Sequence, residues 1–429
     1  MPTSTVFLYL LILPPGAPLS AFPALKPESL KAAGLPADGA SLLVYLRQRI
    51  LAEGDTEKLA ALVKQLGDRS FAVRQKATSA LIAAGPKAFP FLRQAANDGD
   101  AEVRSRANSC LQSLDRQIAV LPLAVQRLVH ERPTNEIPTL LGLVSIADGP
   151  LAETVLSALA ILSMQHGADA ALIDALKSAE PVQRVAAVWT LGRCGSRFRA
   201  QLLPMQKDAD ARVRMAAAVT SIAAGDTASV SALAALLDEK DESAARSVEA
   251  ILTALARDGG PPLSPKSTAA AKRAAWEGWS RLQRDNLELS ALDDWLPAVT
   301  MPQRLRALAR NTVLAMRLAD FATLRSMMGP TFMFGINVYN SQQWFESRNW
   351  TANPALIYFR GLKVVPATRY LPWARSPREV EFLDRMKHAE TWTVFFAADQ
   401  ESWGVVFIQR QDHQLRLAGI STDRAGAPE

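Results

Sequence analysis

The chain has 429 residues, more than one hydrophobic core usually serves, so we expect two or three domains or a stack of repeats. Its formal net charge is +6; residues 297–429 hold 16 Lys/Arg and 11 Asp/Glu, and residues 1–296 hold 32 and 31. This dilute basic excess, without a Lys/Arg run, argues against a nucleic-acid-binding protein.

Residues 6–13 form an apolar run that ends at Pro14. The run is too short to span a bilayer but has the length of a signal-peptide core, although no Lys or Arg precedes it. We predict export through a signal peptide of residues 1–21 and a mature chain that begins at Phe22. The alternative is a disordered N-terminus on a cytoplasmic protein. No other segment is apolar enough to predict an integral membrane helix.

Residues 22–40 are rich in proline and predict a linker, and helical spacing of apolar residues follows. Predicted helices cover residues 41–52, 55–66, 70–83, 89–96, 137–146, 151–162 and 172–176. A Val-Arg pair recurs near the start of alternate helices, and thirty residues separate Arg74 from Arg104 and Arg184 from Arg214. A thirty-residue period with two helices per unit indicates an α-solenoid, because one helix pair cannot bury its apolar face alone.

The repeated segments are residues 68–74, 100–104 and 210–214, with looser copies at 180–184 and 241–246. They resemble the HEAT family, in particular the short bacterial HEAT-like repeats first associated with phycocyanobilin lyases, over residues 55–256. The resemblance implies a superhelical stack of helix pairs and says little about function.

Each position of the motif has a physical reason. The Asp or Glu opens the second helix of a unit, where a carboxylate caps free N–H groups, and the Val is buried. The Arg can reach a carboxylate of the adjacent unit, as family members commonly do. We therefore predict a structural ladder rather than a ligand-binding row, formed by Arg74, Arg104, Arg184 and Arg214. Cys110 and Cys194 lie more than one repeat apart, so we expect buried free thiols.

The repeats are predicted to end at the Gly- and Pro-rich loop of residues 259–265. A helix over residues 267–282 carries Trp276 and Trp279, whose spacing places both rings on one face. We expect it to cap a solenoid of residues 41–285, before a linker of residues 286–302.

The last third predicts a smaller α+β domain, residues 303–421, with a curved antiparallel sheet and a disordered tail at 422–429. Its long first helix covers residues 304–318, and further helices are predicted at 320–328, from Ser341 and at 377–387. Strands are predicted at residues 332–334, 356–359, 362–365, 392–397, 403–409 and 414–420, the last three as a meander.

Residues 317–324 followed by 332–334 resemble the nuclear transport factor 2 family, whose cone-shaped fold curls a sheet around a pocket; the likeness extends over residues 303–421. Some members are enzymes and many only bind or dimerise. The predicted helix at 377–387 departs from that plan.

No catalytic motif is present, and the four histidines include no i,i+4 pair, so neither a metal nor a cofactor is expected. If the cone encloses a pocket, its polar candidates are Asp384, His388 and Glu390, with Tyr358 and Trp392 lining it. Asp384 and His388 are four residues apart and could form an acid–base dyad; an exposed helix pair is the alternative.

The leading hypothesis is therefore a non-enzymatic scaffold, in which the solenoid presents a surface to a protein partner. The C-terminal domain would bind a second partner or form a homodimer. The alternative is a small-molecule-binding or enzymatic pocket of isomerase or lyase type in that domain. DNA binding by the solenoid is disfavoured because its charge is nearly neutral.

Overall fold

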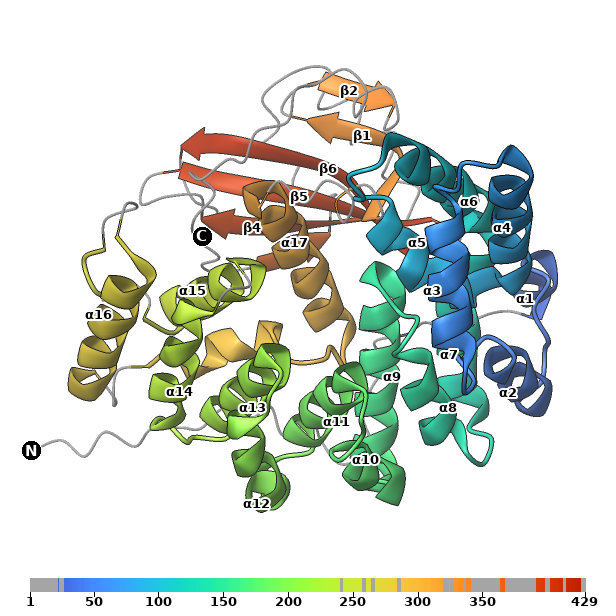
Figure 1. Ribbon diagram of the computed structural model, residues 1–429. Coiled ribbons are helices and arrows are strands. Elements are labelled where there is room, and N and C mark those ends of the chain that lie inside the picture. The colour runs from blue at the N-terminus through green and yellow to red at the C-terminus, as the bar shows by residue number, and fades with distance from the viewer. Residues whose placement is uncertain are drawn as a thin grey trace, which may run out of the picture.

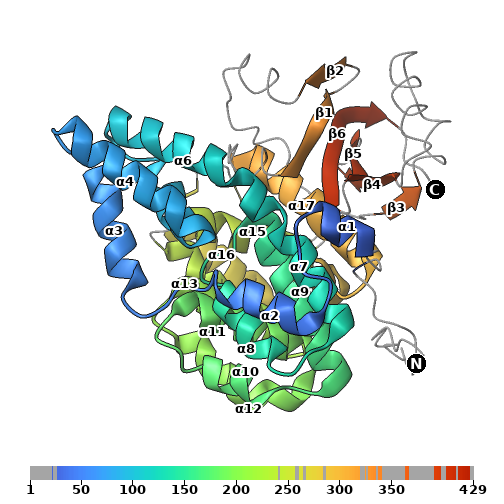
Figure 2. The same cartoon turned by 90° about the vertical axis from the view of Figure 1, so that its right-hand side faces the viewer.

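The computed structural model describes residues 22, 27–239, 242–256, 260–263, 267–283, 287–318, 324, 327–334, 337–340, 363–366, 391–397, 402–411 and 414–425. Its helices form a curved array with a β-sheet at one side (Figures 1 and 2). The expected helical solenoid followed by an α+β domain is therefore present. Within these ranges no helix has the length and apolar character needed to cross a bilayer. The predicted signal peptide lies outside them.

The described residues of the segment predicted as a Pro-rich linker, 22 and 27–40, belong instead to the helical core. It contains helix α1 (Pro27–Ala32) and leads into α2 (Gly39–Arg47), which Asp38 caps by accepting from the Ser41 N–H. Phe22, Leu30 and Leu35 are buried in one apolar cluster with Leu128 and Leu159. These isolated apolar residues show no helical period, so only tertiary packing reveals their burial.

Residues 55–119 form four helices with their own core, called the first block below. They are α3 (Asp55–Gln65), α4 (Phe71–Ala84), α5 (Phe89–Ala95) and α6 (Ala101–Ala119), with the 3-10 turn η1 (Gly85–Ala88) between α4 and α5. Helix α4 ends at Gly85, whose φ of +65° suits glycine. Leu81, Leu92 and Leu114 are fully buried in the cluster of this block. Helices α3 and α4 stand at its free end (Figure 2).

Three helices connect the first block to the rest: α7 (Leu121–Glu131), α8 (Glu136–Leu143) and α9 (Gly149–His166). Helix α7 packs against both α2 and α9. Asp148 caps α9 and forms an ion pair with Arg93 of α5 at 2.8 Å. Helix α9 is buried on several sides, with Val155 and Leu159 fully covered, so it lies at the centre of the array.

The second block runs from residue 170 to 256. Its elements are α10 (Ala170–Ala175), α11 (Pro181–Arg193), η2 (Ser196–Phe198), α12 (Arg199–Leu202), η3 (Leu203–Lys207), α13 (Ala211–Ala223), α14 (Ser229–Ala235), η4 (Leu236–Asp238) and α15 (Glu242–Ala256). Helices α11 and α13 pack closely, because an added Cβ at Gly192 would lie 2.3 Å from Cγ2 of Thr220. Ala187 and Ala217 are fully buried, so small residues permit this approach.

Helix α16 (Ala269–Leu282) lies at the far end of the array (Figure 1) and packs on α14 and η4. Trp276 is 3% exposed and stacks edge-on with Trp279, with ring centroids 5.3 Å apart. The predicted linker of residues 286–302 is not a free connection. It contains η6 (Leu289–Asp294), and Leu292 and Val299 are buried in the clusters of the array.

The C-terminal domain begins with α17 (Met301–Leu318), which lies between the helical array and the sheet (Figures 1 and 2). The strands are β1 (Met328–Phe334), β2 (Asn337–Asn340), β3 (Lys363–Pro366), β4 (Thr391–Ala397), β5 (Ser402–Gln411) and β6 (Gln414–Ala425). Their order is β2-β1-β6-β5-β4-β3. The expected meander β4-β5-β6 is present, with Val394 opposite Val406 and Val406 opposite Ile420.

The sheet differs from the antiparallel one predicted, because β1 pairs with β6 in parallel and the sheet is mixed. Strand β2 was not predicted, and β6 continues to Ala425 into the predicted tail. The apolar face of α17 packs on the sheet through Leu305, Leu308 and Val313. The predicted strand at 356–359 and the helices from Ser341 and at 377–387 lie outside the described residues, as does most of 320–328.

Candidate functional site

The four motif arginines share one local contact. Each Nη1 donates to the carbonyl oxygens of the residues six and five positions earlier, in the turn that precedes its helix. For Arg184 these are Ser178 and Ala179, at 2.8 and 3.2 Å. Each guanidinium therefore fixes the turn between the two helices of its own unit, a contact that the sequence analysis did not predict.

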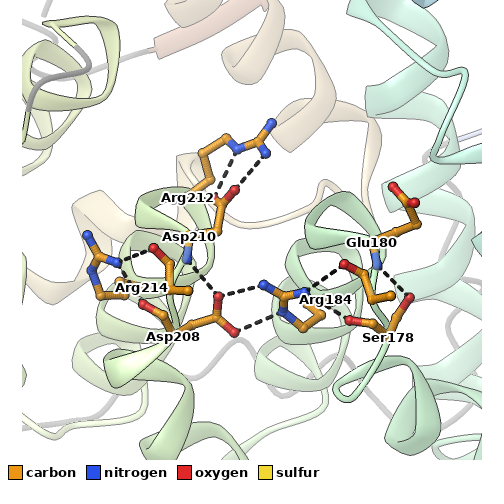
Figure 3. Close-up of polar contacts among 9 residues, drawn as sticks. Ser178, Glu180, Arg184, Asp208, Asp210, Arg212 and Arg214 are labelled. Carbon is orange, nitrogen blue, oxygen red and sulfur yellow. Dashed lines mark hydrogen bonds and ion pairs between the residues drawn. The ribbon is translucent and has the colours of Figure 1, made fainter.

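Three of these arginines also reach a carboxylate of the following unit, as drawn in Figure 3 for Arg184. Arg184 pairs with Asp208 through two bonds, Nε to Oδ2 at 2.8 Å and Nη2 to Oδ1 at 2.7 Å. The other pairs are Arg74 with Glu102, at 3.0 Å, and Arg214 with Glu239. Arg104 has no carboxylate partner among the described residues, and the motif fades in the sequence that follows it.

A second acidic position supports the same turn. Asp68, Asp98 and Asp208 each lie six residues before a motif arginine and accept the backbone N–H two residues later, at 2.8 Å. Asp100 and Asp210 then cap α6 and α13, as predicted for the motif acid. In the predicted motif Asp68 corresponds to Asp100, whereas in the structure Asp68 corresponds to Asp98. Counting back from each arginine would have revealed this register.

Around Arg184, the positive guanidinium lies directly against the negative carboxylate of Asp208 (Figure 3). The hydrogen bond from Arg184 holds the pKa of Asp208 below its usual value, and burial opposes this shift only in part. The side chains of Arg184 and Asp208 are 13% and 11% exposed. This bidentate guanidinium–carboxylate pair links two successive units in a largely enclosed position, and its role in stability stays a prediction.

Helices α4, α6, α11 and α13 carry the motif and are called motif helices below. In the second block, the chain's own later residues cover one face of these helices. Arg193, nine residues after Arg184, donates to the Pro297 carbonyl at 2.9 Å and pairs with Asp293. Trp189, five residues after Arg184, packs on the apolar cluster that contains Leu292. The segment around η6 therefore lies on this face.

The equivalent positions of the first block are open. Ser79 and Ser109 lie five residues after Arg74 and Arg104, as Trp189 does after Arg184, and both are exposed. Ala83 and Ser113 lie nine residues after the same arginines, as Arg193 does, and are also exposed. Gln75 and Ser105, one turn before Ser79 and Ser109, are exposed as well. Phe71, the first residue of α4, is 63% exposed, with the guanidinium carbons of Arg74 and Arg106 each 5.7 Å from its ring centroid. The same face of the repeat is thus covered in one block and accessible in the other.

The predicted pocket stays a prediction, because four of its five residues lie outside the described part of the chain. Asp384, His388, Glu390 and Tyr358 lie outside the described residues, and Trp392 is partly buried on β4 against the core of the C-terminal domain.

A hollow of about 390 Å³ lies between the α7–α8 and α9–α10 turns, where Arg132, Glu136 and Asp169 line it. Burial raises the pKa of Glu136, and Arg132 opposes this shift.

Comparison with known proteins agrees with this geometry. Residues 169–253 match the family model for HEAT repeats. The matched range covers the ladder from Arg184 to Glu239, so the second block consists of HEAT repeats, a class of α-solenoid associated with protein–protein interaction. A search of curated proteins gives no match to the chain.

Proposed function

We propose that the protein is a non-enzymatic scaffold that binds a protein partner on the open face of the first block. The observation that carries this proposal is that the same face of the motif helices is covered in the second block and exposed to solvent in the first. Residues around η6 cover the motif helices of the second block, whereas Gln75, Ser79, Ser105 and Ser109 are exposed. A HEAT stack offers a continuous surface for a partner, and here only part of that surface is filled from within the chain.

Phe71 gives this surface an anchor. Aromatic and arginine side chains are enriched among the residues that dominate binding energy. Two guanidinium groups already flank the ring of Phe71, which limits the freedom it would lose on binding. A partner that covers the ring would gain apolar burial without first ordering the side chain.

Site-specific photo-crosslinking of the full-length chain in its native host tests the proposal. A crosslinking amino acid replaces Ser109 on the open face or, as control, exposed Lys64 on α3. We expect a discrete adduct from position 109 that is absent from position 64 and is reduced at least about fivefold by Phe71→Ala. The proposal fails if position 109 gives no adduct, or if both positions give the same adducts.

For the C-terminal domain we propose a second interaction, either with another protein or with a second copy of the chain. The likeness to the nuclear transport factor 2 family supports it, together with a long helix laid on one face of a sheet. Light scattering of the full-length chain across a hundredfold range of concentration measures whether a dimer forms; a constant monomer mass would exclude self-association.

A further inference from the structure

Helix α17 has two chemically different faces. Leu305, Leu308, Val313 and Met316 pack on strands of the sheet. Arg304, Arg306, Arg310 and Asn311 lie on the opposite side at helical spacing and are called the arginine face below. Helix α17 therefore contributes apolar residues to the C-terminal domain and charged residues to whatever lies on its other side.

The arginine face contacts acidic and aromatic side chains of the helical array. Asn311 donates to Glu153 on α9. Burial raises the pKa of the Glu153 carboxyl, and Arg310 and Arg304 oppose this shift only in part. The guanidinium carbon of Arg304 lies 5.0 Å from the ring centroid of Phe22, and that of Arg310 lies 4.7 Å from that of Trp295.

Arg306 adds a fourth contact, donating to Asp293 at 3.4 Å. The set Phe22, Glu153, Asp293 and Trp295 is called the acid–aromatic surface below.

The apolar side chains of α17 pack on the sheet, so separation of α17 from this surface would uncover mainly the rings of Phe22 and Trp295. Within the described residues, the apolar cluster that contains α17 includes no side chain of the helical array. Val299 is buried in the array, whereas Met301 packs on the core of the C-terminal domain. The boundary therefore falls at Thr300, and an interface made of charged and cation–π contacts is of the kind that permits domain motion.

We propose that the acid–aromatic surface is a binding site for arginine-bearing helices, which α17 occupies in this structure and which a basic helix of a partner protein occupies when the C-terminal domain moves away. Acidic and aromatic side chains together match a guanidinium by charge and by cation–π attraction. Because α17 is tethered, it competes at an effective concentration of about millimolar, so a partner helix binds weakly until α17 is displaced.

The test uses a fluorescent peptide of residues 301–318 in which Leu305, Leu308, Val313 and Met316 are alanine, so that only the arginine face can bind. Its affinity is measured by anisotropy for the full-length chain and for the full-length variant Arg304→Gln/Arg310→Gln, whose own α17 is weakened. We expect the variant to bind the peptide at least about tenfold more tightly, with an affinity that falls as salt rises.

Two controls distinguish recognition of the guanidinium groups from non-specific binding of the peptide. The peptide with glutamine at 304 and 310 should lose binding, and Glu153→Arg in the variant chain should abolish it. If the glutamine variant unfolds, the milder chain variant Arg304→Lys/Arg310→Lys replaces it in the binding measurement. Its helix content is checked by circular dichroism. Equal binding of both peptides, or no binding to either weakened chain, would overturn the proposal.

Discussion

The pair of Arg184 and Asp208 allows the sharpest test of the ladder. Replacing Arg184 with Ala removes a bidentate pair and two bonds to turn carbonyls, and leaves an 11% exposed carboxylate without its cation. Breaking a fully buried pair costs about 3–5 kcal/mol, and a hydrogen bond to a charged group contributes about 1.5–3 kcal/mol. Asp208 keeps its bond to the Asp210 N–H, so we expect a loss of about 3 kcal/mol.

Arg104 provides the matched control, because its guanidinium donates to two carbonyls and has no carboxylate partner in the described part of the chain. Both bonds of Arg104 are exposed to solvent, which screens them, so Arg104→Ala is expected to cost about 1 kcal/mol. Urea unfolding, followed by circular dichroism, measures both variants. A double-mutant cycle with Asp208→Asn should give a coupling of about 2 kcal/mol. A coupling under about 0.5 kcal/mol, or equal losses for both arginines, would refute the ladder.

The pH dependence of this coupling follows from the pKa of Asp208. The hydrogen bond from Arg184 depresses that pKa in the folded protein below the usual value of a carboxyl group. A depressed carboxyl pKa stabilises the folded state above the unfolded pKa, and this contribution disappears as pH falls through the folded pKa. The coupling should therefore be unchanged between pH 7 and pH 5 and vanish only in stronger acid.

Three further predictions concern other parts of the chain. Burial raises the pKa of Glu153, so stability should fall as pH rises above about 4.5 through that raised value; Glu153→Gln should remove this fall, as thermal unfolding at several pH values would show. Gly192→Ala should destabilise by about 1–3 kcal/mol because its Cβ meets Thr220, whereas Gly278→Ala on α16, with nothing within 4 Å, should be neutral or stabilising. If residues 1–21 direct export, N-terminal sequencing of the secreted chain should begin at Phe22; an intact N-terminus would contradict it.

Several features of the structure were accessible from the sequence because they depend on neighbours along the chain. The thirty-residue spacing of Arg74 and Arg104 gave the helix pairs, since apolar residues at helical spacing define both the helix and its buried side. Alternating residues separated by polar turns gave the β4-β5-β6 meander. The turn contacts of the motif arginines are equally local. The Asp six residues before Arg74, Arg104 and Arg214 was visible in the sequence, although the predicted motif began two residues later, at Asp100 and Asp210.

The tertiary structure alone decided where the aperiodic segments lie. Residues 22–40 and 286–302 looked like linkers, yet Phe22 and Leu292 are buried, because their partners come from helices distant in sequence. The parallel pairing of β1 with β6 is likewise non-local. The helical period of α17 placed its arginines on one face, but only the fold brought that face to Glu153. The exposure of Phe71 likewise depends on the fold, because no described element covers its ring. Local periodicity specifies elements and their apolar sides, whereas the surfaces that remain open depend on how distant elements pack.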